Sequence, residues 1–106
     1  MNQMKKLGVV ALALMSAWAA QAQEANTKLQ TRVLVASCAS CHGTDGRPVE
    51  GSAIPSLAGS SKATITMQMN AFKDGTRTAT VMHQISKGYT DEQIDRIASY
   101  FATVKR

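Results

Sequence analysis

The sequence predicts an all-α fold of about four helices. Three observations support this prediction. Apolar residues recur at helical spacing in several segments, β-branched residues never alternate long enough to form strands, and the last segment carries a complete N-terminal capping signal. No internal repeat or low-complexity segment divides the chain after its N-terminal segment. We therefore expect one small helical domain.

The first 22 residues have the three parts of a secretory signal peptide. Lys5 and Lys6 give a positive start, a mostly apolar run follows, and Ala20-Gln21-Ala22 matches the small-x-small cleavage rule. The alternative is an uncleaved membrane anchor, but the apolar run is shorter than the roughly 20 residues that a bilayer requires. We expect cleavage after Ala22, a domain over residues 23–106, a periplasmic location and no stable membrane insertion after cleavage.

The first helix of this domain is predicted from Asn26 or Thr27, either of which can cap it, to Ser37. Its apolar residues at helical spacing are Leu29, Val33 and Ala36. A long loop follows, because "GTDGRPVEGSAIPSLAG" over residues 43–59 is rich in Gly, Pro, Ser and Asp. Loops of this length in a compact domain are usually functional or wrapped around a ligand.

Three further helical segments follow the loop. One covers residues 62–73 and ends at Asp74-Gly75, and a shorter one covers residues 79–86 and stops before Gly88. The last helix is the best marked, because Thr90 and Gln93 form a capping box at its start. Its predicted buried stripe consists of Ile94, Ile97, Phe101 and Val104.

Residues 23–106 are mildly basic and poor in aromatic residues. Removal of the signal peptide takes away two lysines and no acid, so the formal net charge falls from +5 to +3. The basic residues are scattered, without interleaved aromatics, which argues against nucleic-acid binding and is consistent with weak attraction of an acidic partner. A domain with so few aromatic residues commonly requires a disulfide, a metal or another staple.

The only two cysteines, Cys38 and Cys41, stand three positions apart in "SCASCHGTDG", and His42 follows directly. Three of the possible chemistries fit poorly. A disulfide across so short a loop gives little stabilisation, and a dithiol oxidoreductase requires the pair at a helix N-terminus after a strand. A zinc site requires four ligands, which these three residues and the distant His83 do not provide at a suitable spacing.

The remaining chemistry is covalent attachment of haem, for which C-x-x-C-H is the signature. Two intervening residues match the distance between the two vinyl groups on one porphyrin edge, and Gly43 lets the backbone turn beside the ring. One haem c would also fill the sparse core. We therefore predict that Cys38 and Cys41 bind haem covalently and that His42 is the proximal iron ligand.

Three segments together resemble the bacterial class I cytochromes c: "CASCHGTDG", "IPSLAG" and "MHQISKGYTDEQIDRIASYFA". The resemblance covers nearly all of residues 23–106 and implies the small fold of that class, with about four helices wrapped around one covalent haem. Within the class, "KGYTDEQ" and "FKDGTR" are most similar to the single-haem cytochrome subunit of flavocytochrome c sulfide dehydrogenases.

The residues alone leave the second iron ligand open among Met67, Met69 and Met82. Met69 shares a face with other apolar residues of its helix, which favours a core position, and Met67 points elsewhere on the same helix. Met82 lies in a Gly-bounded region 40 residues after His42, far enough along the chain to reach the opposite face of the ring. Packing beside Ile85 in the core is the alternative for Met82.

The resemblance favours Met82, because the ligand methionine of the family stands eight positions before the Ser or Thr that caps the final helix, here Thr90. His83 is the rival ligand, although a lone histidine beside a ligand is more often a surface or supporting residue. The resemblance also implies that the Pro55 carbonyl accepts the free ring N–H of His42. A rigid turn is the alternative role of Pro55.

Iron held by His42 and Met82 has no open position, which suits one-electron exchange better than the binding of oxygen. We expect a periplasmic electron carrier, not an enzyme, that meets redox partner proteins in brief contacts. One alternative is a haem c subunit docked on a flavoprotein that oxidises sulfide, and another is a haem enzyme or sensor in which Met82 is displaced. Arg77 is a candidate propionate contact, although an exposed arginine is the commoner state.

Overall fold

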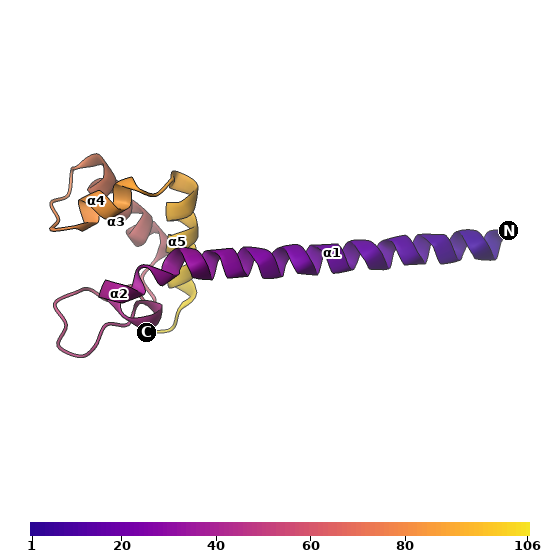
Figure 1. Cartoon of the computed structure of the whole chain (residues 1–106), viewed down its shortest axis with the longest axis horizontal. Helices are drawn as coiled ribbons and strands as arrows, with labels where there is room; N and C mark the ends of the chain where they lie inside the picture. Colours follow the sequence, from indigo (N-terminus) through magenta and orange to yellow (C-terminus); the bar gives the residue numbers. More distant parts are fainter. The chain divides into compact units, whose positions relative to one another are not determined.

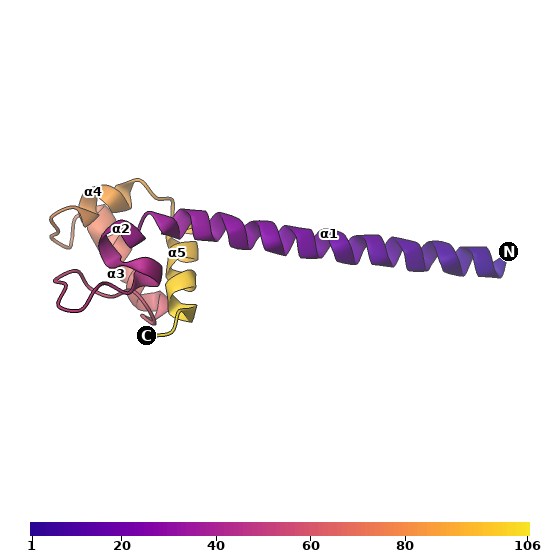
Figure 2. The same cartoon turned by 60° about the horizontal axis from the view of Figure 1, so that its bottom comes forward.

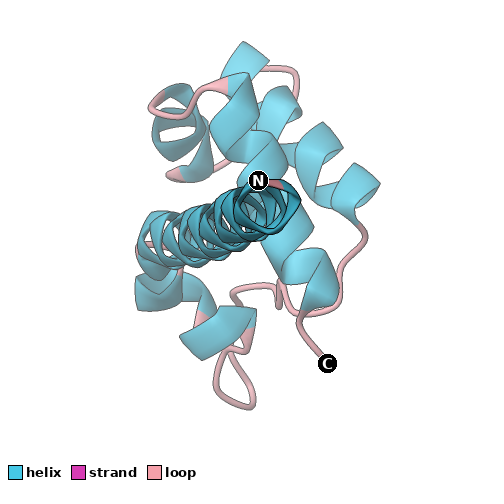
Figure 3. Cartoon of the chain, turned by 90° about the vertical axis from the view of Figure 1, so that its right-hand side faces the viewer, coloured by secondary structure: helices cyan, strands magenta, loops and turns pink.

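Helices and their connecting loops make up the structure, a computed structural model that describes residues 1–106, and no strand is present (Figure 3). This confirms the predicted all-α class. The helices are α1 (Asn2–Ala36), α2 (Ala39–His42), the 3₁₀ helix η1 (Thr44–Gly46), α3 (Lys62–Asp74), α4 (Met82–Lys87) and α5 (Asp91–Thr103) (Figure 1). The chain forms two compact units, residues 1–30 and residues 31–106.

Helix α1 begins at Asn2 and not at Asn26 or Thr27, so the predicted start was wrong. The sequence between Asn2 and Asn26 contains no proline that would break the helix. The Thr27 hydroxyl donates to the carbonyl of Gln23 in the preceding turn, as a residue inside a helix does. The predicted apolar positions are also shifted, because Leu29 and Val33 are exposed whereas Val35 is buried. None of the helices is both long enough and apolar enough to span a membrane.

The core of residues 31–106 forms where α3 packs against α4 and α5 (Figures 1 and 2). Its buried members are Val35, Ile65, Met69, Ile94, Ile97, Ala98 and Phe101, here called the core cluster. Three of the four residues predicted as the buried stripe of α5 belong to it. The fourth, Val104, is only half-buried because α5 ends at Thr103 and Val104 is its C-cap.

Both ends of the predicted capping box of α5 are present. The backbone N–H of Gln93 donates to the Thr90 hydroxyl at 3.1 Å, and the Thr90 N–H donates to Gln93 Oε1 at 2.9 Å. At the start of α3, the Ser61 hydroxyl accepts from the Thr64 N–H at 3.1 Å. Local side chains therefore satisfy backbone donors that no helix can satisfy internally.

Helix α4 begins at Met82, three positions after the predicted start at Ala79. Val81, its N-cap, has a φ of −136° outside the helical range, and the β-branched residues Thr80 and Val81 have slightly lower helix propensity, so they favour a helix that starts after them. The Ser86 side chain is fully buried and donates to Met69 Sδ at 3.5 Å. This contact fastens α4, and with it Met82, to α3.

Candidate functional site

Cys38, Cys41 and His42 lie on a single helical turn. Cys38 is the N-cap of α2, and its carbonyl oxygen accepts from the N–H groups of Cys41 at 3.3 Å and of His42 at 2.9 Å. The sequence predicted the three residues as a group but did not predict the short helix that holds them. Residues three apart on a turn face the same side, so both thiols are available to one ligand.

The two thiols are free and are not joined in a disulfide. Cys38 is half-buried against the core cluster, whereas Cys41 is exposed. Burial raises the pKa of the Cys38 thiol, more than its hydrogen bond to Ser37 lowers it. A reactive dithiol requires the opposite shift, since only the thiolate is nucleophilic. Cys38 itself therefore lacks the environment of a nucleophilic thiol.

The His42 ring is buried and held by the loop, because its Nδ1 lies 2.7 Å from the carbonyl oxygen of Pro55. A carbonyl oxygen only accepts, so Nδ1 carries the hydrogen, and in the neutral imidazole the lone pair is then on Nε2. This is the arrangement that orients a metal-binding histidine. Pro55, which the family resemblance singled out, therefore lies at the expected acceptor position.

Gly43 allows the chain to turn sharply after His42. Its φ is +80°, and a Cβ atom at this position would clash with the carbonyl oxygen of Arg47. No side chain fits there. After this turn, residues 47–59 form a loop that returns to α2 and places the Pro55 carbonyl beside the His42 ring.

The three candidate methionines have different environments. Met69 is 7% exposed and its sulfur accepts from the Ser86 hydroxyl, so it serves the core. Met67 is 65% exposed on the same helix. Met82 is half-buried and, like Cys38, packs against the core cluster, whereas Ile85 is exposed. Met82 is therefore neither a deep core residue nor a surface residue.

Arg77 and His83 have different environments in the structure. The Arg77 guanidinium lies 4.7 Å from the centre of the Phe72 ring, a cation–π contact that gives it a structural partner. The Nδ1 atom of His83, next to Met82, is buried without a hydrogen-bond partner. No group of three or more His, Cys, Asp and Glu side chains is arranged to hold a metal ion, so the zinc alternative lacks its ligands.

The residues present fit a large apolar prosthetic group. Ile54 is 41% exposed and precedes Pro55, and Val81 is 51% exposed and precedes Met82. One of these apolar side chains is next to Pro55, the hydrogen-bond acceptor of His42, and the other is next to Met82, a candidate ligand, so both are compatible with a large apolar group bound there. Together with the free thiols and the oriented imidazole of His42, these side chains match the requirements of covalent haem.

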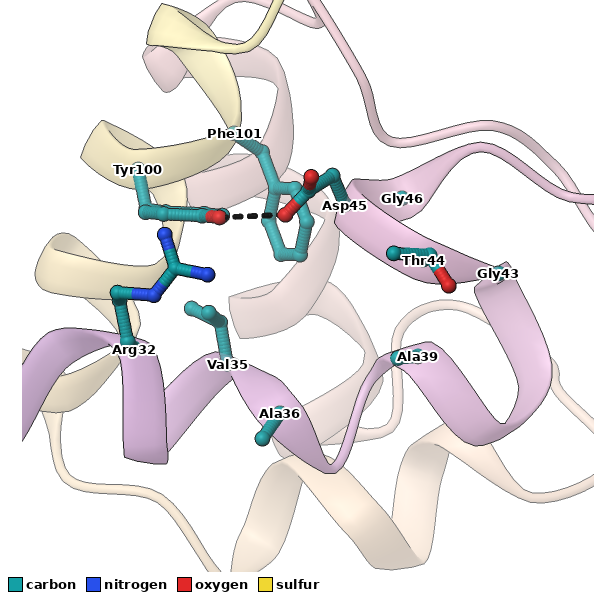
Figure 4. A pocket seen from close by; sticks show the side chains of 10 residues that line it. All are labelled: Arg32, Val35, Ala36, Ala39, Gly43, Thr44, Asp45, Gly46, Tyr100 and Phe101. Carbon is teal, nitrogen blue, oxygen red and sulfur yellow. Dashed lines mark hydrogen bonds between the residues drawn. The ribbon is translucent and has the colours of Figure 1, made fainter.

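A small cavity that sequence reasoning did not find lies between α1, α2, η1 and α5 in the unit of residues 31–106 (Figure 4). Its walls include Arg32, Val35, Asp45, Tyr100 and Phe101, and its volume is about 180 Å³. Figure 4 shows the Tyr100 hydroxyl pointing at the Asp45 carboxylate, and the two are 2.7 Å apart. The only sequence signal was Asp45-Gly46, a pair that favours turns.

Comparisons with known proteins agree on one family. Residues 27–105 match the sequence model of the family described as Cytochrome c. The chain is 45% identical over 80 residues to the "Cytochrome subunit of sulfide dehydrogenase" of Chlorobaculum tepidum, which covers 76% of this chain and 71% of that protein. It is 33% identical to the "Thiosulfate dehydrogenase electron acceptor" of Stutzerimonas stutzeri, over 87% of this chain and 43% of that protein.

A solved structure of cytochrome c4 from Acidithiobacillus ferrooxidans is also similar. The TM-score is 0.59 at 37% sequence identity, and the match covers 63% of this chain and 38% of that chain. This chain therefore spans less than half the length of two of the three proteins compared here.

Proposed function

Because the chain belongs to the cytochrome c family and has the fold of its class I members, we propose that it carries single electrons through one covalent haem c and catalyses no reaction itself. Cys38 and Cys41 would hold the haem through thioether bonds, and His42 Nε2 and Met82 Sδ would bind the iron. The observation that carries this assignment is the 2.7 Å contact between His42 Nδ1 and the Pro55 carbonyl, which leaves Nε2 free.

Bound haem would supply a one-electron iron couple. The protein itself would hold the iron ligands in place and limit the access of other molecules to the iron. A buried imidazole on one helical turn and a thioether at the start of α4 would both bind the iron and leave it without a free ligand position for a substrate. A methionine sulfur ligand favours the reduced state and raises the potential, as it does in cytochromes c.

Attachment of haem gives the first test of this function. The protein is produced in a host that matures c-type cytochromes, denatured and extracted with acidified acetone. Haem should remain with the wild-type protein and with Cys38→Ser, which keeps one thiol, and should be extracted from a Cys38→Ser/Cys41→Ser variant. Complete extraction from the wild-type protein would contradict covalent attachment.

The second candidate function is a haem subunit docked on a flavoprotein, favoured by the 45% identity to a sulfide dehydrogenase cytochrome subunit. The domain is small and mildly basic, which suits both a free carrier and a docked subunit. Purification from the native organism separates the two. A free carrier elutes at the size of one domain, whereas a docked subunit elutes with an equimolar flavin-containing protein.

Export to the periplasm and cleavage after Ala22 belong to the same proposal. Support comes from the exposure of every residue from 1 to 30, because no buried side chain of that unit would be lost on cleavage. The mass of the purified protein tests this directly. It should equal residues 23–106 plus one haem, and a mass that includes residues 1–22 would contradict cleavage.

A further inference from the structure

The contact between Tyr100 and Asp45 joins the last helix to the loop that follows the haem-attachment motif. The Tyr100 hydroxyl donates to Asp45 Oδ1 at 2.7 Å, across 55 positions of the chain (Figure 4). Asp45 has a φ of +54° and is the only non-glycine residue in the left-handed region. Aspartate tolerates this conformation better than most non-glycine residues, and the hydrogen bond from Tyr100 stabilises it further.

The residue held next to Asp45 is Gly46, whose carbonyl oxygen accepts three hydrogen bonds. The donors are the Leu57 N–H at 2.9 Å, the Ala58 N–H at 3.2 Å and the Ser56 hydroxyl at 3.0 Å. Gly46 is also tightly enclosed, because a Cβ atom there would lie 2.9 Å from side-chain atoms of Leu57 and Phe101. The position of this one carbonyl therefore determines the path of residues 56–58.

The segment fixed by Gly46 begins directly after Pro55. The Pro55 carbonyl is the acceptor for His42 Nδ1, and a shift of residues 56–58 would move this oxygen away from the ring. A stronger hydrogen bond at Nδ1 makes the imidazole a better electron donor through Nε2. The conformation at Asp45 is thus connected to the iron ligand by a short series of direct contacts.

We propose that Tyr100 and Asp45 are positioning residues for His42. Their hydrogen bond holds the Gly46 carbonyl where it fixes residues 56–58, and through the Pro55 carbonyl it sets the strength of the hydrogen bond at His42 Nδ1. This inference rests on the proposed function, since it concerns His42 as a ligand of haem iron.

The test uses the haem-loaded protein and two measurements, solvent exchange of the His42 Nδ1 proton by NMR and the midpoint potential. Tyr100→Phe removes the donor. Asp45→Gly removes the acceptor, and glycine adopts the positive φ without strain. Asp45→Asn keeps an acceptor oxygen, and asparagine also adopts a positive φ readily. The matched control is Tyr89→Phe, which removes a hydroxyl bonded at 3.0 Å to Ser37 instead.

Tyr100→Phe and Asp45→Gly should each speed up exchange about tenfold, the effect of losing one hydrogen bond, and should make the potential more positive. The double variant should add little to either single change, because both remove the same contact. Asp45→Asn and Tyr89→Phe should stay close to the wild-type exchange rate.

Two results would overturn the inference. One is an exchange rate of the His42 Nδ1 proton that is the same in Tyr100→Phe and Asp45→Gly as in Tyr89→Phe. The other is a potential that shifts as much in Asp45→Asn as in Asp45→Gly with unchanged exchange, because the carboxylate would then act through its charge. Failure of the proposed function is distinguishable, since the wild-type protein would then lack a slowly exchanging Nδ1 proton and a haem-bound His42.

Discussion

The Nδ1 atom of His42 lies 2.7 Å from the carbonyl oxygen of Pro55, 13 positions further along the chain. The imidazole of the attachment motif is therefore oriented by a loop and not by its own helical turn. A proline at this point fixes one backbone dihedral of the residue that provides the acceptor. The loop thereby contributes to the site although it contains no proposed iron ligand.

Pro55→Ala keeps the carbonyl acceptor but releases the backbone, so two effects are expected. The free energy of unfolding should fall by about 0.4–1 kcal/mol, because the unfolded chain gains freedom. The His42 Nδ1 proton should also exchange faster in the haem-loaded protein. Pro48→Ala is the control, since Pro48 is the only other proline. Equal exchange rates in the two variants would show that Pro55 does not hold the acceptor in place.

Thr90→Ala should lower the free energy of unfolding by about 1 kcal/mol, because it removes the acceptor of the Gln93 N–H at the start of α5. Urea unfolding followed by circular dichroism measures the change. Thr103→Ala is a matched control on the same helix, where the hydroxyl only donates to the Tyr100 carbonyl one turn earlier. A loss in Thr103→Ala as large as that in Thr90→Ala would contradict the role of the capping box.

Ser86→Val should destabilise the protein by about 1–3 kcal/mol, because the Ser86 side chain is fully buried against Met69 and additional atoms have no space. Ser86→Ala loses only a weak hydrogen bond to sulfur and should cost less than about 1 kcal/mol. Thermal unfolding of both variants checks this order. Thr78→Val, at an exposed position, is the control and should change stability little.

The Tyr100 hydroxyl should make stability depend on pH under alkaline conditions. Its hydrogen bond to Asp45, aided by burial and by the negative charge of Asp45, raises the pKa of Tyr100 in the folded protein. The unfolded chain therefore releases this proton first, and the stabilisation is complete below about pH 10. It should be lost as the pH rises through the folded pKa.

Urea unfolding at a series of pH values measures this dependence. Tyr100→Phe should show a shallower loss of stability above about pH 10 than the wild-type protein. Tyr89→Phe is the control and keeps the Tyr100 contact. An alkaline slope in Tyr100→Phe that equals the wild-type slope would contradict this assignment.

The helices that sequence patterns predicted well are those with local signals at their ends. For α5, the Thr90 and Gln93 pair marked the start, and for α3 the Asp74-Gly75 pair marked the end. For α1, Asn26 and Thr27 were possible caps, but no helix-breaking proline precedes them and the helix runs through both from Asn2. The single turn of α2 is too short for a periodic pattern to reveal.

The proposed site likewise contains residues that the sequence predicts and a contact that only the fold reveals. Cys38, Cys41 and His42 are predicted as haem-binding residues because C-x-x-C-H falls within five positions of the chain, and Met82 is predicted because the family resemblance places the ligand relative to Thr90. The contact of Tyr100 with Asp45 joins residues 55 positions apart. No local pattern encodes such a pair, and only the fold brings the two residues together.

The most direct test of the central claim is the long-wavelength absorption band that ferric haem shows when a methionine sulfur binds its iron. The wild-type protein and the controls Met67→Ala and His83→Ala should show the band. Met82→Ala should lose it while the haem stays attached, and should bind carbon monoxide readily when reduced. A band that persists in Met82→Ala, or is absent from the wild-type protein, would contradict an electron carrier with His42 and Met82 as its iron ligands.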